Sequence, residues 1–149
     1  MPENETIERA KQDKQEGKAP STQAGEFVKE EIDHIREGKH GARSAKQAIA
    51  IGLSKARRAG VKLPAPEKGK TSEETRKQAA RDLHKGQSSS KSKTSAKRSR
   101  ASSQALKREG RQAASKTALS RHASKAASSR SKTERSRSAR KAARTRKKT

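Results

Sequence analysis

The sequence contains no cysteine, tryptophan or tyrosine, and only one phenylalanine. Without cysteine, disulfides, thiolate catalysis and cysteine-ligated zinc are excluded. The near absence of aromatic side chains disfavours a protein that binds single strands by stacking their bases. No apolar run approaches the roughly 18 residues of a membrane span, and the first residues lack the apolar segment of a signal peptide. We therefore expect an intracellular protein.

Apolar residues of every kind are scarce. They make up 26% of the chain, against 38% charged residues and a net charge of +24. Chains of this composition bury too little apolar surface to offset the entropy lost on ordering. We therefore expect a mostly α-helical protein with extensive disorder around one small folded head.

The positive charge is concentrated in the last part of the chain. Residues 88–149 contain 21 lysines and arginines against two acids, whereas residues 1–63 contain 13 against 10. This basic tail is of low complexity, and its residues 120–133 repeat as 136–149 with nine of fourteen positions identical. Like charges repel along a helix, so we expect the tail to be disordered when free and helical when a polyanion neutralises it.

Two segments ahead of the tail have a strong helical pattern. Residues 22–37 and 44–60 are amphipathic, and the short glycine-flanked segment 38–43 connects them. Ser44 and Gln47 have the spacing of a capping box, which predicts a helix start at this point. The pattern predicts a small helix-turn-helix hairpin that forms the head.

Two further segments predict short isolated helices. Residues 3–16 have little that would make them dock, and residues 72–86 are equally poor in apolar side chains. The chain thus divides into an N-terminal helix and linker (1–20), a hairpin domain (21–64), a linker with a short helix (65–87) and the basic tail (88–149).

The expected hairpin core is small. It comprises nine side chains: Phe27, Val28, Ile32, Ile35, Ile49, Ile51, Leu53, Val61 and Leu63. A core of this size often needs a partner, so a homodimer through residues 21–64 is one expectation. Ile51 lies on the side of its helix away from the packing face. It belongs to a dimer interface, is covered by the segment at Val61, or is simply exposed.

Residues 46–60, KQAIAIGLSKARRAG, with the preceding HGARSA, resemble a group of small basic bacterial proteins of unknown function. The signature of that group is KQAIAIGLSxARxAG after a lysine- and serine-rich lead, and the resemblance extends over about residues 18–64. The tail separately resembles the Lys/Ala/Ser-rich tails of linker histones and bacterial histone-like proteins.

No catalytic or metal-binding pattern is evident, so we expect neither an enzyme nor a cofactor. His34 and His40 lie near one turn, but the histidines have no His-x-x-x-His spacing and are expected to be solvated. Acidic residues of the first hairpin helix are expected on its solvated face, without a pocket that would perturb a pKa. They are Glu26, Glu30, Glu31, Asp33 and Glu37.

Basic residues are the candidate site, because lysine and arginine bind phosphates without reading sequence. Four lie at the end of the hairpin: Lys55, Arg57, Arg58 and Lys62. Their alternative role is to neutralise that helix end and pair with the acidic first helix. The tail candidates are Lys97, Arg98, Arg100, Lys107, Arg108, Arg111, Arg121, Arg130, Arg135, Arg137, Arg140, Lys141, Arg144, Arg146, Lys147 and Lys148.

These features predict a nucleic-acid-binding protein without sequence preference. Duplex DNA is the favoured partner, and a nucleoid-associated, histone-like protein of the bacterial cytoplasm is the expected type. Two alternatives remain at this point: an RNA- or ribosome-associated basic protein, and a hydrophilic stress protein whose disorder is its function.

Overall fold

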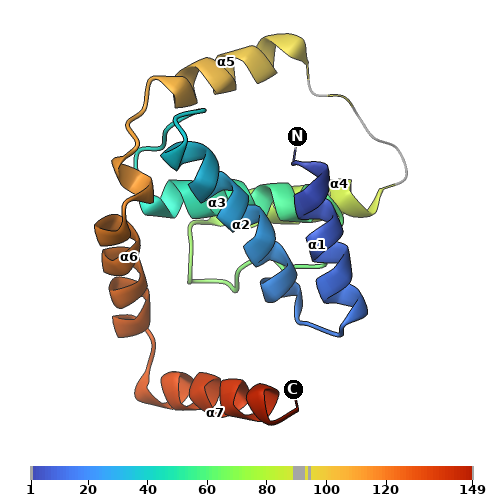
Figure 1. Cartoon of the computed structure of the whole chain (residues 1–149), viewed down its shortest axis with the longest axis vertical. Coiled ribbons are helices and arrows are strands. Elements are labelled where there is room, and N and C mark those ends of the chain that lie inside the picture. The colour runs from blue at the N-terminus through green and yellow to red at the C-terminus, as the bar shows by residue number, and fades with distance from the viewer. Residues whose placement is uncertain (1, 89–92, 94, 149) are drawn as a thin grey trace.

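The computed structural model describes residues 2–88, 93 and 95–148, and all regular elements of this part are helices (Figure 1). An isolated bridge between Lys68 and Thr71 is the one β-type pairing among the described residues. In chain order the helices are α1 (Asn4–Gln15), α2 (Pro20–Arg36), α3 (Ala45–Arg58), α4 (Glu73–Gln87), α5 (Ala96–Lys107), η1 (Gln112–Ala114), α6 (Lys116–Ser128) and α7 (Lys132–Lys148).

Local signals fix the start of α3 and the end of α2. The Ser44 hydroxyl accepts a hydrogen bond from the Gln47 backbone N–H at 3.2 Å, which confirms the predicted cap. The Gln47 side chain accepts from the Arg43 backbone N–H at 2.7 Å, one residue before the position expected for a capping box. Gly38 follows α2 with a φ of 81°, a conformation that favours glycine.

Helices α2 and α3 approach each other closely along a stripe of small residues. Ala48, Gly52 and Ala56 of α3 are buried at intervals of four residues. A Cβ at Gly52 would lie 2.6 Å from Val28 Cα, so only glycine fits there. The predicted hairpin core included Ile49 and Leu53, but both are only half-buried.

The core has two parts, one at each end of the α2–α3 pair. The first part is Ala10, Ala24, Phe27, Ala56 and Val61, to which α1 contributes. The second part is Ile32, Ile35, Ala42, Ala48, Ala113 and Ala114, to which η1 contributes.

Helix α1 packs on α2, in contrast to the isolated helix expected from its sequence. Thr6 and Ala10 of α1 are buried, and Arg9 donates to Glu26 of α2 at 2.7 Å. The hairpin is therefore covered by α1, which precedes it in the sequence, and by η1, which follows it. A homodimer was one expectation, because a core of this size often needs a partner, and this cover removes that reason.

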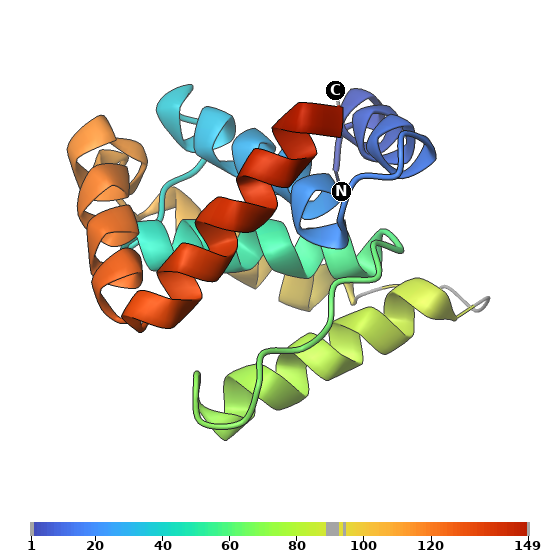
Figure 2. The same ribbon diagram turned by 90° about the horizontal axis from the view of Figure 1, so that it is seen from below.

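Helix α4 also packs against the hairpin, and it contacts α3. The Ser54 hydroxyl donates to the Asp82 carboxylate at 2.7 Å, and Ala79 and Asp82 are buried. A Cβ at Gly86 would lie 1.8 Å from the Arg57 carbonyl oxygen, so the backbones meet there directly. Figure 2 shows α4 and α3 running alongside each other.

The structure does not support the expected disorder of the tail. Its described residues form α5, η1, α6, α7 and their connections, whereas residues 89–92, 94 and 149 of the expected tail lie outside the described residues. Serine N-caps explain the helix starts: the hydroxyls of Ser95, Ser115 and Ser131 each accept from the backbone N–H three residues on. Composition alone missed these local signals.

The tail is also anchored to the head through backbone contacts. Gly41 N–H donates to the Leu106 carbonyl at 2.8 Å, and Ala42 N–H donates to the Gly110 carbonyl at 3.1 Å. Ala114 is completely buried. The loop between α2 and α3 therefore attaches the basic part of the chain to the head through backbone hydrogen bonds.

Two acids expected on a solvated face are in fact buried. Glu31 is 0% exposed and Glu30 is 4% exposed, because α3 and α1 cover different flanks of α2. Glu31 Oε1 accepts from the Lys55 ammonium group, and Glu30 Oε1 accepts from the Glu3 backbone N–H at 2.7 Å. The head thus holds buried charge with specific partners.

Two glycines within helices give opposite predictions for one substitution. Gly52→Ala places a methyl against the α2 backbone, so we expect it to lower the free energy of unfolding by about 1–3 kcal/mol. Nothing lies within 4 Å of a Cβ at Gly25 of α2. Gly25→Ala is therefore expected to raise the free energy of unfolding by about 0.5–1 kcal/mol. Urea denaturation measures both, and equal effects would contradict the close approach.

Removal of the Lys55 ammonium leaves the Glu31 carboxylate buried without its cation. We expect Lys55→Met to lower the free energy of unfolding by about 3 kcal/mol, the lower end of the range for breaking a buried pair, because Lys55 is itself partly exposed. The control is Lys62→Met, an exposed lysine shortly beyond α3, for which the change should stay within about 0.5 kcal/mol. Equal stability of the two variants would show that Lys55 does not hold Glu31.

Candidate nucleic-acid interface

Helix α7 presents the densest group of cations in the described structure. It contains nine lysines and arginines and one acid over 17 residues, and none of its residues is buried. At 1.5 Å per residue the helix is about 25 Å long. A helix with so little apolar surface gains little from docking, and its exposed side chains can meet a partner.

One face of α7 is richer in charge than the other. Arg137, Arg140, Lys141 and Arg144 follow the spacing that places residues on one side of a helix. Together with Lys132, Thr133 and Ser136 they line a shallow recess along the helix. Alanines occupy the opposite side, at positions 139, 142 and 143.

The start of α7 is fixed by a reciprocal capping box. Ser131 Oγ accepts from the Glu134 backbone N–H at 3.2 Å, and Glu134 Oε2 accepts from the Ser131 backbone N–H at 3.0 Å. That backbone hydrogen bond lowers the pKa of the Glu134 carboxyl, and the charge of Lys70 adds to the effect. The single acid of α7 therefore has a structural role.

Helix α7 stands apart from the packed head. Figure 1 shows it leaving the end of α6 and crossing one end of the molecule. An ion pair of Lys70 with Glu134, at 3.7 Å, links the start of α7 to the segment before α4. The basic recess is lined by residues of α7 alone, so no neighbouring helix fills it.

The other tail candidates are exposed on α5, α6 and their connections. They are Lys97, Arg98, Arg100, Lys107, Arg108, Arg111, Arg121 and Arg130. Arg111 also serves the fold, because its Nη1 donates to the Arg36 carbonyl at 3.5 Å. On α7 the remaining candidates Arg135, Arg146, Lys147 and Lys148 are exposed as well.

The basic residues at the end of α3 are largely occupied within the head. Lys55 pairs with Glu31, and Arg58, although exposed, donates to the Ser54 hydroxyl at 2.9 Å. Arg57 is 7% exposed and donates to two backbone carbonyls of the segment after α3. This geometry favours the alternative that they pair with acids and stabilise the helix end.

Burial affects Arg57 electrostatically. It lowers the pKa of the guanidinium, and the nearby Asp82 carboxylate opposes that shift. With its donors turned to the carbonyls of Leu63 and Pro64, Arg57 holds the segment after α3 in place. Lys62 is exposed on that segment.

Sequence reasoning missed two features that the structure brings together. Lys132 was not a candidate, yet it lines the recess of α7. Glu31, His34 and His40 were considered solvated, yet their ligand atoms converge. The overlooked signal was Glu-x-x-His within one helix, because residues three apart share a face.

Comparison with known proteins finds one family. Residues 4–70 match a family of unknown function (DUF6496). The match includes α1, α2 and α3, and it contains the range 18–64 of the resemblance noted in the sequence. No curated protein and no solved structure matches the chain. The head is therefore similar to a family of unknown function, and the match does not reach α4–α7.

None of the described helices is long and apolar enough to cross a membrane.

Proposed function

We propose that this protein binds nucleic acid without sequence preference, through phosphate contacts made by the basic helices α5–α7. Duplex DNA is the proposed partner and a nucleoid-associated role is the proposed setting. The observation that carries the proposal is the exposed basic face of α7, with its recess and its single acid already occupied by a cap.

The charge density of α7 suits a polyanion. Duplex DNA carries one negative charge per about 1.7 Å of axis, so a helix about 25 Å long lies within reach of several phosphates. Each contact releases condensed counterions, and that release is the source of affinity. The helix offers no aromatic side chain for stacking between bases, which supports phosphate binding over base recognition.

The helical state of the tail also supports this proposal. Like charges four residues apart destabilise a free helix, and neutralisation by phosphates removes that cost. Because α7 already has a helical start at Ser131, less conformational entropy is lost on binding than for a disordered tail.

Helix α3 is poorly placed to read bases in the way of a helix-turn-helix recognition helix. Its small-residue stripe packs on α2, and α4 docks on another side. A recognition helix must project its side chains into the major groove. This packing supports a structural role for the hairpin and leaves phosphate binding to the tail.

The central test removes four charges from the recess. We expect a variant with Arg137, Arg140, Lys141 and Arg144 all changed to Gln to bind duplex DNA more weakly at low salt. Its slope of log K against log salt should be shallower by about 0.9 for each phosphate that the variant no longer neutralises. Fluorescence anisotropy over a salt series measures both quantities.

The control variant changes the same number of charges outside the basic tail. Lys11, Lys14, Lys46 and Lys77 are exposed on α1, α3 and α4, and their change to Gln gives an equal net charge. We expect the control to keep most of the affinity and slope of the unchanged protein. Equal weakening in both variants would contradict a localised interface, and preferential competition by structured RNA would identify RNA as the partner.

A further inference from the structure

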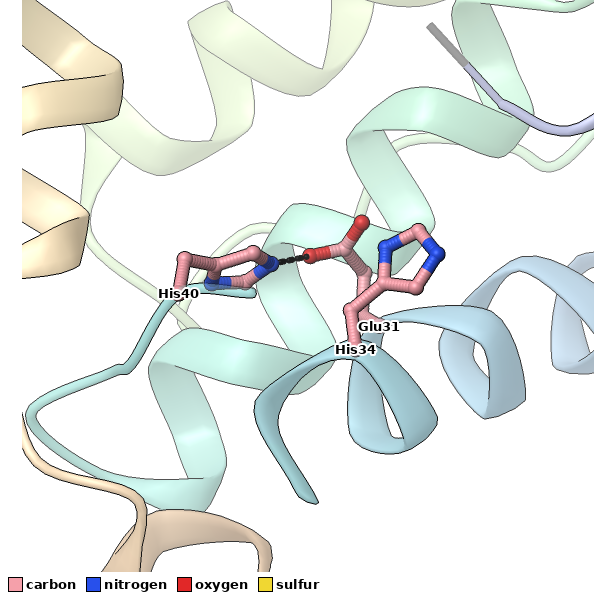
Figure 3. A group of neighbouring side chains, drawn as sticks. All are labelled: Glu31, His34 and His40. Carbon is pink, nitrogen blue, oxygen red and sulfur yellow. Dashed lines mark ion pairs between the residues drawn. The ribbon is translucent and has the colours of Figure 1, made fainter. Parts of the chain in front are cut away.

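Three side chains with metal-ligand chemistry converge where the loop after α2 returns to that helix. Glu31 and His34 lie one turn apart on α2, and His40 lies in the loop before α3. One ligand atom of each lies within 4.8 Å of the other two. Figure 3 shows the imidazole rings on either side of the Glu31 carboxylate. Two histidines and one glutamate are a common set of zinc ligands.

The Glu31 carboxylate is buried, and only one of its two oxygens accepts a hydrogen bond. Its side chain is 0% exposed, and Oε1 is paired with Lys55. Oε2 accepts no hydrogen bond, and its neighbour 3.0 Å away, His40 Nε2, forms an ion pair with it only when the imidazole ring is protonated (Figure 3). A buried carboxylate oxygen without a partner is costly, so a cation at this position would lower the energy of the folded state.

The hydrogen bond at His40 Nδ1 favours the neutral tautomer whose other nitrogen has a lone pair toward that oxygen. His40 Nδ1 lies 3.0 Å from the Gly41 carbonyl, which only accepts, so Nδ1 carries the proton. In the neutral ring Nε2 then has a free lone pair that faces Glu31 Oε2. A divalent cation between the two atoms replaces their repulsion with two coordinate bonds. A backbone carbonyl that fixes the other ring nitrogen is typical of metal-binding histidines.

His34 completes the set of ligands. Its Nε2 lies 3.0 Å from Glu3 Oε1, which leaves Nδ1 for an ion on the Glu31 side. Figure 3 shows a ring nitrogen of His34 turned toward the Glu31 carboxylate. The side chains of His34 and His40 are only 14% and 15% exposed, so both rings are held mainly within the protein.

We propose that Glu31, His34 and His40 bind one divalent transition-metal cation of the zinc type, with the fourth position open to water. The ion would fix the loop between α2 and α3, whose Gly41 and Ala42 N–H groups hold the chain at the Leu106 and Gly110 carbonyls. It therefore reinforces the junction between the head and the basic helices. This site is independent of the proposed nucleic-acid binding.

Calorimetric titration of zinc sulfate into the full chain tests the site directly. We expect one ion per chain, and a rise in melting temperature as zinc is added. His40→Ala should weaken binding by at least about tenfold. The matched control is His84→Ala, a histidine exposed on α4, which should bind as the unchanged protein does.

Two further measurements keep the proposal falsifiable if the His40 variant folds poorly. Cobalt(II) bound to the unchanged chain should give the intense visible bands of a four-coordinate site, and their absence would overturn the proposal. His34→Ala removes a second proposed ligand and should also weaken zinc binding by at least about tenfold. Unchanged zinc affinity in His34→Ala, or equal weak binding in all variants, would also overturn the proposal.

Discussion

The rest of the structure depends on the close approach of α2 and α3 at Gly52. With no side chain at this position, the two backbones come so near that an added Cβ would lie 2.6 Å from Val28 Cα. Lys55 follows three residues later on α3 and pairs with the carboxylate of Glu31 across the interface. The same approach buries Ala48 beside Ile32 and Ile35, which creates the apolar surface against which Ala113 and Ala114 pack. A wider separation of α2 and α3 would remove the ion pair and that apolar surface.

The molecule separates its charges by role. In the head, cations face acids and carbonyls: Lys55 faces Glu31, Arg9 faces Glu26, and Arg57 donates to backbone oxygens. In α7 the single acid caps its own helix, and nine cations outnumber it. The head therefore uses its charge for folding, while the tail presents an excess of charge at its surface. This division is the physical basis of the proposed phosphate binding.

The helices of the head were predictable because their signals are local. Apolar periodicity and the Ser44 cap located α2 and α3 to within a few residues. The docking of α1 and α4 was not predictable, since it depends on close contacts such as Gly86 against the Arg57 carbonyl, which have no periodic pattern. The burial of Glu31 was missed for the same reason. Helical periodicity shows one apolar face, and it gives no sign of a second helix that covers a polar flank.

The tail shows the limit of reasoning from composition. Its net charge predicted disorder, but serine caps at Ser95, Ser115 and Ser131 start helices, and two buried alanines anchor the segment. The candidate cations of the tail were identified from residue type alone. Their arrangement on one face of α7 required the helix to be present. The candidates at the end of α3 were identified in the same way, and tertiary pairing occupies most of them.

Hydrogen–deuterium exchange of the full chain, with and without duplex DNA, tests the central claim most directly. We expect the amides of α7 to be measurably protected from exchange in the free protein. On DNA binding the protection of α7 should increase further, whereas that of α2 and α3 should change little. Exchange of α7 at the rate of an unstructured chain in the free protein, or protection by DNA confined to α2 and α3, would contradict the claim.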